Sequence, residues 1–282
     1  MNSSDSGGAS MDGTSTDRTF AGSIPAFYER YMVPLIFEPY AADMASRARQ
    51  VAPARVLEIA AGTGVVTRAL ATALPPGSSI VATDLNQAML DHAATVGTSR
   101  SVTWRQADAM QLPFPDEAFD LVVCQFGVMF FPDKGQAFAQ ARRVLRPGGT
   151  LLFNVWDSID QNEFADTVTQ ALAQRFPTNP PRFLARVPHG YHNGSTIAQD
   201  LALGGFPRPA EISTVSERSV AASPRVAALA YCQGTPLRSE IESRGTALLD
   251  DATTIATEAM ARRFGSGVVS GKIQAHVVAV ER

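Results

Sequence analysis

The sequence predicts an α/β fold with a doubly wound, mostly parallel sheet, and three observations support this prediction. Strand-like and helix-like segments alternate through the first half of the chain, which is typical of parallel sheets with helical crossovers. The strand-like segments are largely apolar, as strands covered on both faces usually are. Glu58 and Asp84 end the first two strands, and Asp108 follows the third. Because parallel strands end at one rim of the sheet, where such folds bind ligands, we expect the three acids to lie there.

The first strand continues directly into a turn and a helix. The apolar run 56–59 is followed by the small-residue loop 60–64, and an Ala/Leu-rich helix is expected over 67–74. Gly62 and Gly64 lack Cβ atoms, so a ligand can approach the loop backbone, where N–H groups point outward at the start of the helix. A tight connection that binds nothing would have the same pattern, so this segment alone is not decisive.

The second strand, expected over Ser79–Asp84, provides a candidate ribose ligand. Asp84 lies 20 positions after Gly64, the distance at which a neighbouring strand places a carboxylate beside a ribose. An ionised carboxylate accepts hydrogen bonds from two vicinal hydroxyls at once. The alternative role for Asp84 is to cap the helix that begins near Asn86.

The remaining elements follow from apolar periodicity and from Gly/Pro breaks. Further strands are expected at 102–106, 118–124, 150–155, 211–220 and 272–280. Further helices are expected at 41–51, 134–145, 162–176, 195–203, 224–232, 236–244 and 247–264. The aromatic-rich stretch 24–40 contains three prolines and is expected to form two short helical pieces.

Composition excludes several classes of function. The chain is 45% hydrophobic and 18% charged with a net charge of −3, as in ordinary soluble proteins. Lys134 and Lys272 are its only lysines, and without a basic run we expect no nucleic-acid partner. Cys124 and Cys232 lack metal-site spacing and favour a reduced, cytoplasmic setting without a disulfide or a metal. No apolar stretch is long enough for a membrane span.

The length of 282 residues suits one domain with insertions. Residues 1–19 are rich in Ser, Gly, Thr and Asp and are expected to form a disordered tail. The domain is expected over 20–282, with an N-terminal helical cap at 20–50 and helical insertions at 157–210 and 221–270. The insertion at 157–210 is expected to overhang the rim of the sheet and cover a substrate. The insertion at 221–270 is expected either to enlarge the substrate cavity or to form a dimer contact.

Five segments in order resemble the class I S-adenosylmethionine-dependent methyltransferases, in particular the "type 11" group with ubiquinone-biosynthesis-like members. The resemblance covers about residues 50 to 156. The matching segments are 56–64 (VLEIAAGTG), Asp84 with Met89, 106–109 (QADA), 119–122 (FDLV) and 143–149 (RVLRPGG). It implies a Rossmann-like methyltransferase fold of seven strands, of which the last is antiparallel and lies over 272–280.

The resemblance also implies roles for individual residues around S-adenosyl-L-methionine. Each role is placed at the position that matches the family pattern. For the methionine part, the resemblance implies Glu58 and the loop with Ala60, Gly62 and Gly64, next to Thr67. Asp84 is expected to bind the ribose hydroxyls. Leu85 and Met89 are expected to pack on adenine, and Asp108 and the Ala109 N–H to bind the edge of the adenine ring. Gln125 and Phe126 are expected to lie near the reactive methyl group.

The expected reaction is an in-line methyl transfer to a small, rather apolar molecule through an O, N or C acceptor. Alignment of donor and acceptor provides most of the catalysis, so a general base is optional. His189, His192 and Tyr28 are candidate catalytic residues; two histidines in a Pro/Gly-rich turn can equally be exposed loop residues. Tyr28 lies in an apolar helical stripe that can equally be core.

Other functions remain open at this point. A nicotinamide-dependent oxidoreductase also has a glycine turn and a distant acid, but Thr67 stands where the dinucleotide pattern has its third glycine. Two further alternatives are that the chain binds S-adenosylmethionine without catalysis, or that it methylates a protein or RNA. The oligomeric state is not predicted.

Overall fold

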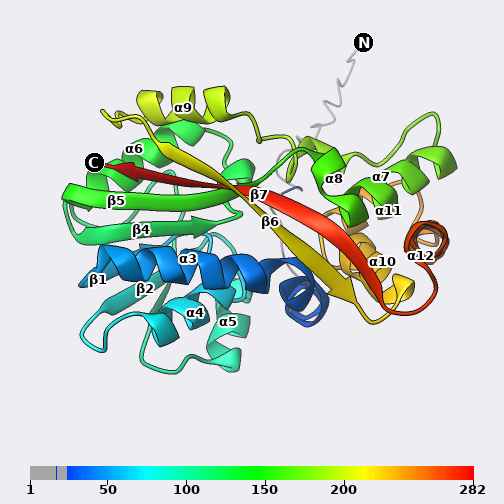
Figure 1. Cartoon of the computed structure of the whole chain (residues 1–282), viewed down its shortest axis with the longest axis horizontal. Coiled ribbons are helices and arrows are strands. Elements are labelled where there is room, and N and C mark those ends of the chain that lie inside the picture. Colours follow the sequence, from blue (N-terminus) through cyan, green and yellow to red (C-terminus); the bar gives the residue numbers. More distant parts are fainter. Residues whose placement is uncertain (1–16, 18–23) are drawn as a thin grey trace, which may run out of the picture.

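The computed structural model describes Asp17 and residues 24–282, and most of the tail predicted over 1–19 lies outside them. The strands are β1 (Arg55–Glu58), β2 (Ser79–Asp84), β3 (Thr103–Gln106), β4 (Phe119–Gln125), β5 (Leu145–Trp156), β6 (Glu211–Ala221) and β7 (Val269–Glu281). They form one sheet in the order β3-β2-β1-β4-β5-β7-β6 (Figure 1). β7 is antiparallel to both of its neighbours, and every other pairing is parallel. The predicted seven-stranded, mostly parallel sheet with an antiparallel last strand is confirmed.

Helices cover both faces of this sheet. The helical segments are α2 (Ile24–Phe27), η1 (Tyr28–Phe37), α3 (Glu38–Val51), α4 (Val65–Ala73), α5 (Gln87–Val96), η2 (Val128–Phe130), α6 (Lys134–Val144), η3 (Ile159–Gln161), α7 (Glu163–Arg175), α8 (Phe183–Arg186), α9 (Gly194–Leu203), α10 (Pro224–Gln233), α11 (Leu237–Glu242) and α12 (Leu248–Phe264). Successive strand residues point to opposite faces, so Leu121 packs in a core with α3 and α4 while Val122 packs in the larger core that includes α6.

The N-terminal helical stretch differs from its prediction. Residues 24–51 are helical without interruption, whereas the prolines predicted two short pieces. The middle segment, η1, is π-helical and contains Pro34. A proline removes one backbone donor, and the wider π-helical turns accommodate that loss within the helix. Pro39 lies in the first turn of α3, where a missing N–H costs least.

Most of the helices that follow β5 and β6 gather at one end of the molecule, whereas α9 packs on α6. In Figure 1, β6 and β7 extend beyond the other strands toward α7, α8, α10, α11 and α12. This is also the end toward which the parallel strands point, so the helical group stands over their carboxyl ends. These helices belong to the insertions predicted over 157–210 and 221–270, and the role of those insertions as a substrate cap stays a prediction.

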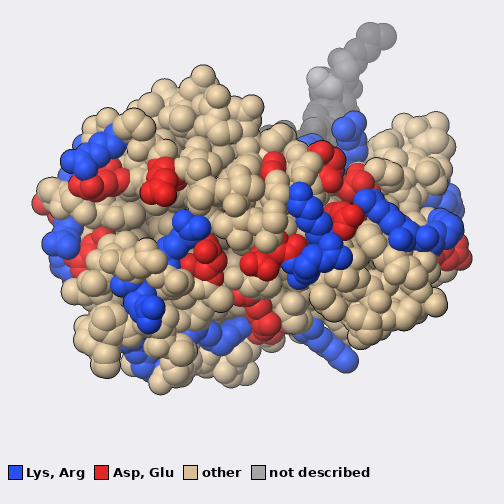
Figure 2. Space-filling model, in the orientation of Figure 1, with Lys and Arg blue, Asp and Glu red and all other residues tan. Residues whose placement is uncertain are grey.

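The surface carries charges of both signs. On the face shown in Figure 2, acidic and basic side chains are interspersed and neither forms a continuous field. Among the described residues, none of the helices combines the length and the apolarity needed to cross a bilayer.

Candidate active site

A cavity that we call the rim pocket opens at the carboxyl ends of β1, β2 and β4. It encloses about 780 Å³, including solvent at its mouth. Ten residues singled out from the sequence line it: Tyr28, Ala60, Gly62, Asp84, Leu85, Met89, Asp108, Ala109, Gln125 and Phe126. These residues come from the N-terminal helical stretch, from α5 and from the segments that follow four strands. Folding therefore brings together motifs that are separate in the sequence.

The Asp84 side chain holds two of the loops around the rim pocket in place by hydrogen bonds. Its Oδ2 accepts a hydrogen bond from the Gly62 N–H at 2.9 Å, and its Oδ1 accepts one from the Asn86 N–H at 2.8 Å. The carboxyl group is 7% exposed, and burial raises its pKa. Gly62 has a φ of +57°, and a Cβ at this position would face the Met89 methyl group at 3.9 Å. The glycine loop, the acid and Met89 therefore form a cradle that a side chain on Gly62 would begin to fill.

Glu58, Gly64 and Thr67 do not line the rim pocket. Glu58 is 1% exposed, and its carboxyl Oε2 accepts a hydrogen bond from the Thr67 hydroxyl at 2.6 Å. Burial raises the pKa of Glu58 to about 8. Gly64 has a φ of +85°, and a Cβ there would lie 3.0 Å from the Trp104 ring. The three residues pack the turn between β1 and α4 on the side away from the rim pocket. Their expected contact with a cofactor stays a prediction.

The raised pKa of Glu58 predicts a pH-dependent stability. Between its ordinary pKa of 4.5 and about 8, the folded protein retains a proton that the unfolded chain releases. The free energy of unfolding should therefore fall with rising pH, by at most about 1.4 kcal/mol per pH unit from this group. Glu58→Gln removes the titration, so the variant should gain stability relative to the wild type between pH 5.5 and 8. Urea unfolding at both pH values measures this, and equal pH slopes in the two proteins would refute it.

The wall of the rim pocket beside β4 has a strained backbone and close packing. Phe126 and Ala60 both have a positive φ, of 50° and 55°, a region that non-glycine residues rarely adopt. The Phe126 N–H is held by the Asn154 side chain at 2.9 Å. A Cβ on Gly127 would lie 2.5 Å from the Ala60 Cβ and 2.7 Å from the Cys124 sulfur. Only glycine at position 127 allows the first loop to approach β4 this closely.

Gly127→Ala should consequently destabilise the protein by about 1–3 kcal/mol, as overpacked cores usually do. Adding Ala60→Gly removes one of the two clashing groups and relieves the positive φ of Ala60. The double variant should recover part of the lost stability, as a double-mutant cycle in urea unfolding would measure. Strictly additive effects would contradict the contact between these two loops.

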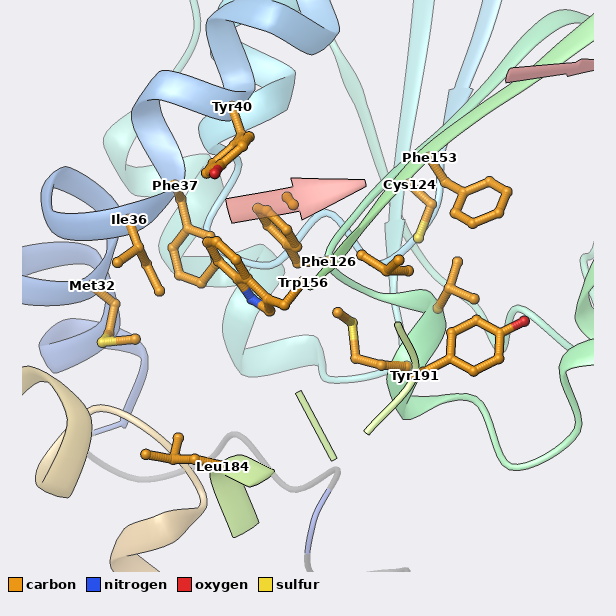
Figure 3. Packing of buried hydrophobic residues seen from close by; sticks show 14 of the residues in the cluster. Met32, Ile36, Phe37, Tyr40, Cys124, Phe126, Phe153, Trp156, Leu184 and Tyr191 are labelled. Atoms are coloured by element: carbon orange, nitrogen blue, oxygen red, sulfur yellow. The ribbon is translucent and has the colours of Figure 1, made fainter. Parts of the chain in front are cut away.

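A second cavity, the apolar chamber, adjoins the rim pocket. It encloses about 560 Å³ and shares Tyr28, Phe126 and Phe130 with the rim pocket. Its other lining residues are Met32, Ile36, Phe37, Trp156, Asn162, Phe183, Leu184, Pro188, His189, Tyr231, Thr235, Pro236 and Ile273. Figure 3 shows Phe37, Phe126 and Trp156 side by side, with Leu184 of α8 opposite them. The rings of Phe126 and Trp156 stack with centroids 3.8 Å apart.

The three candidate catalytic residues lie in different places. Tyr28 belongs to the wall between the two cavities, and burial raises its pKa, so the phenol stays protonated at neutral pH. His189 lines the apolar chamber, whereas His192 lines neither cavity and bonds through Nδ1 to the His189 carbonyl oxygen at 2.9 Å. Burial lowers the pKa of His189 to about 4. His189 is thus a weaker base than an ordinary histidine, and the catalytic role of all three residues stays a prediction.

Sequence reasoning did not identify several residues of the chamber. Trp156 ends β5 and Tyr231 lies on α10, far apart in the chain. Trp156 had a usable signal, because it ends a strand at the rim where ligands bind. Tyr231 lies in an Ala-rich helix and had no local signal.

Comparison with known proteins agrees with these motifs. Residues 57–153 match the family described as "Methyltransferase domain". The ubiquinone/menaquinone biosynthesis C-methyltransferase UbiE of Saccharophagus degradans is 41% identical over 102 residues, which cover 35% of this chain and 41% of that protein. The enzyme of the same name from Pseudomonas paraeruginosa is 43% identical over 102 residues, covering 35% and 40%. The alignment thus spans about two fifths of the length of these curated relatives.

Solved structures show the same fold. A methyltransferase structure from Bacillus halodurans superimposes with a TM-score of 0.52 at 21% identity, covering 84% of this chain and 97% of that one. Phosphoethanolamine N-methyltransferase 2 of Haemonchus contortus gives 0.56 at 18% identity, covering 94% and 59%. The [4+2]-cyclase SpnF gives 0.53 at 18% identity, covering 86% and 81%, so the fold alone does not specify methyl transfer. The sequence match is more specific than the fold: over residues 57–153 this chain is similar to the family described as "Methyltransferase domain".

Proposed function

We propose that this protein transfers a methyl group from S-adenosylmethionine to a small, rather apolar molecule. The observation that carries the proposal is the shared wall of the two cavities. Tyr28, Phe126 and Phe130 line both the rim pocket and the apolar chamber. A donor in one cavity and an acceptor in the other would meet at this wall, as the reaction requires.

The rim pocket suits the cofactor. Asp84 provides carboxylate oxygens for ribose hydroxyls, and Gly62 leaves the loop open beside Met89. Asp108 and Ala109 lie at the edge where adenine would bind, and the buried Gln125 Oε1 has no hydrogen-bond partner within the described part of the chain. Bound there, S-adenosylmethionine would supply a methyl group on a sulfonium, which is an excellent leaving group.

The protein would then act mainly by alignment. Orientation of two reactants in one site can lower a barrier by about 7–11 kcal/mol. The aromatic wall around Phe37, Phe126 and Trp156 would exclude water and position the acceptor. Helices α7, α8, α10 and α11 would act as the substrate cap, together with the N-terminal helical stretch. The proposal covers transfer to an O, N or C acceptor.

Three alternatives are less well supported. The family match disfavours a nicotinamide-dependent oxidoreductase. The net charge of −3 and the interspersed charges on the face shown in Figure 2 do not suggest a nucleic-acid substrate. A protein that only binds the cofactor would not need an apolar chamber beside it. The free, buried Cys124 and Cys232 agree with a cytoplasmic setting, which we propose as well.

Thermal unfolding with added ligands tests the cofactor assignment. S-adenosylhomocysteine, the product form of the cofactor, should raise the midpoint of unfolding, whereas NADH should not. Activity is then tested with labelled S-adenosylmethionine on a cell lysate that is separated afterwards into macromolecules and small molecules. Label in the small-molecule fraction is expected. Label only in macromolecules, or no transfer to any acceptor, would refute the proposed function.

A further inference from the structure

His189 places a hydrogen-bond acceptor inside the apolar chamber. Its imidazole is 6% exposed, and its Nδ1 lies 2.9 Å from the backbone oxygen of Asp157. A carbonyl oxygen can only accept, so Nδ1 must carry the proton. In the neutral ring Nε2 then carries a lone pair. The lowered pKa of His189 agrees with a neutral ring at physiological pH.

The other polar side chains of the chamber are largely occupied by the protein itself. Asn162 donates to backbone carbonyls and accepts from the Gln274 N–H at 3.1 Å. Thr235 donates to the Tyr231 carbonyl at 2.8 Å and accepts from the Leu237 N–H at 3.2 Å. Of the polar side chains that line the chamber alone, this leaves His189 Nε2, the Tyr231 hydroxyl and the Trp156 indole N–H without a hydrogen-bond partner among the described residues. The indole N–H can only donate, so it cannot accept a hydrogen bond from a ligand hydroxyl.

The rest of the lining limits the shape and charge of an occupant. No Asp, Glu, Lys or Arg is among the described residues that line the chamber, so a charged molecule would lose its hydration there without compensation. The stacked rings of Phe126 and Trp156 lie 3° from parallel, and Phe37 lies beside them. Such a wall favours a flat molecule, because aromatic surfaces pack best on planar groups.

Building on the proposed function, we propose that the methyl acceptor is an uncharged planar molecule with a hydroxyl group, and that His189 Nε2 accepts a hydrogen bond from this hydroxyl. His189 is then a specificity-determining residue. An analogue without the hydroxyl leaves Nε2 buried and unpaired, and a site built around a hydrogen bond rejects such analogues strongly. The proton stays on the hydroxyl during binding, so the role does not require His189 to act as a base.

The test compares two probes of nearly equal size, 2-naphthol and 2-methylnaphthalene, by calorimetry on the full chain saturated with S-adenosylhomocysteine. The wild type should bind 2-naphthol at least tenfold more tightly. His189→Asn can keep a donor toward the Asp157 carbonyl, but its shorter side chain places no acceptor at the position of Nε2, so it should abolish the preference. His189→Gln places an amide group near the position of Nε2 and should retain part of it. Unfolding curves of both variants verify that they are folded.

Tyr231→Phe is the matched control, because it removes the other unpaired side chain of the chamber that can accept a hydrogen bond. The preference for 2-naphthol should survive in this variant. Loss of the preference in Tyr231→Phe but not in His189→Asn overturns the assignment, and so does a wild type that binds both probes equally or neither. Binding of S-adenosylhomocysteine is measured first and separately. Its failure refutes the proposed function, whereas a failed preference in the loaded protein refutes only the role of His189.

Discussion

Asp84→Ala should weaken the binding of S-adenosylhomocysteine at least tenfold while the protein remains folded. The substitution removes the carboxylate assigned to the ribose hydroxyls, and hydrogen bonds to a charged group contribute about 1.5–3 kcal/mol each. It also releases the N–H groups of Gly62 and Asn86, which the two carboxylate oxygens now hold. The expected loss of affinity therefore has two sources: a missing contact with the ligand and a less ordered loop around Gly62. Isothermal titration calorimetry measures the change in affinity.

Asp91→Ala serves as the control for this experiment. Asp91 is exposed on α5, where it accepts a hydrogen bond from the Gln87 side chain. Its replacement alters the net charge by the same amount and should leave affinity within about twofold, because an exposed charge outside the pocket contributes little. Equal affinity in the wild type and in Asp84→Ala would remove the ribose assignment.

Gly62→Val should abolish the thermal stabilisation that S-adenosylhomocysteine gives to the wild type. The Cβ at position 62 points toward Met89 in the rim pocket, so the branched side chain would occupy cofactor space. The φ of +57° adds backbone strain of about 1–2 kcal/mol for an L-residue. Differential scanning fluorimetry with and without ligand separates the two effects, because strain lowers the midpoint of unfolding in both conditions.

Gly97→Val provides a matched strain control. Gly97 also has a positive φ, of +80°, but a Cβ there would have no neighbour within 4 Å. This variant should lose stability and still respond to the ligand as the wild type does. A ligand response that persists in Gly62→Val would show that the cofactor does not approach the first loop.

The sequence predicted the sheet and much of the rim pocket because both depend on local patterns. Alternation of strands and helices determines the topology, and acids at strand ends mark one rim. Glu58 shows the limit of this reasoning. Its position at the end of β1 was predictable, but the direction of its side chain, toward Thr67 and away from the pocket, depends on how the following helix packs.

The apolar chamber was not predictable in the same way. Its wall combines Phe37 from η1, Trp156 from β5, His189 from a loop and Tyr231 from α10. These residues come together only after long-range packing, which periodicity does not encode. Long-range packing also explains why the helix continues through Pro34. The packing of η1 on its neighbours overrides the tendency of proline to end a helix.

A crystal structure with S-adenosylhomocysteine tests the central claim most directly. We expect the ligand in the rim pocket, with Asp84 on the ribose hydroxyls, Asp108 beside adenine and the sulfur directed at the wall formed by Tyr28, Phe126 and Phe130. The apolar chamber should then be the only open space next to the sulfur. A ligand bound elsewhere, or a sulfur directed away from the chamber, would contradict the account of how donor and acceptor meet.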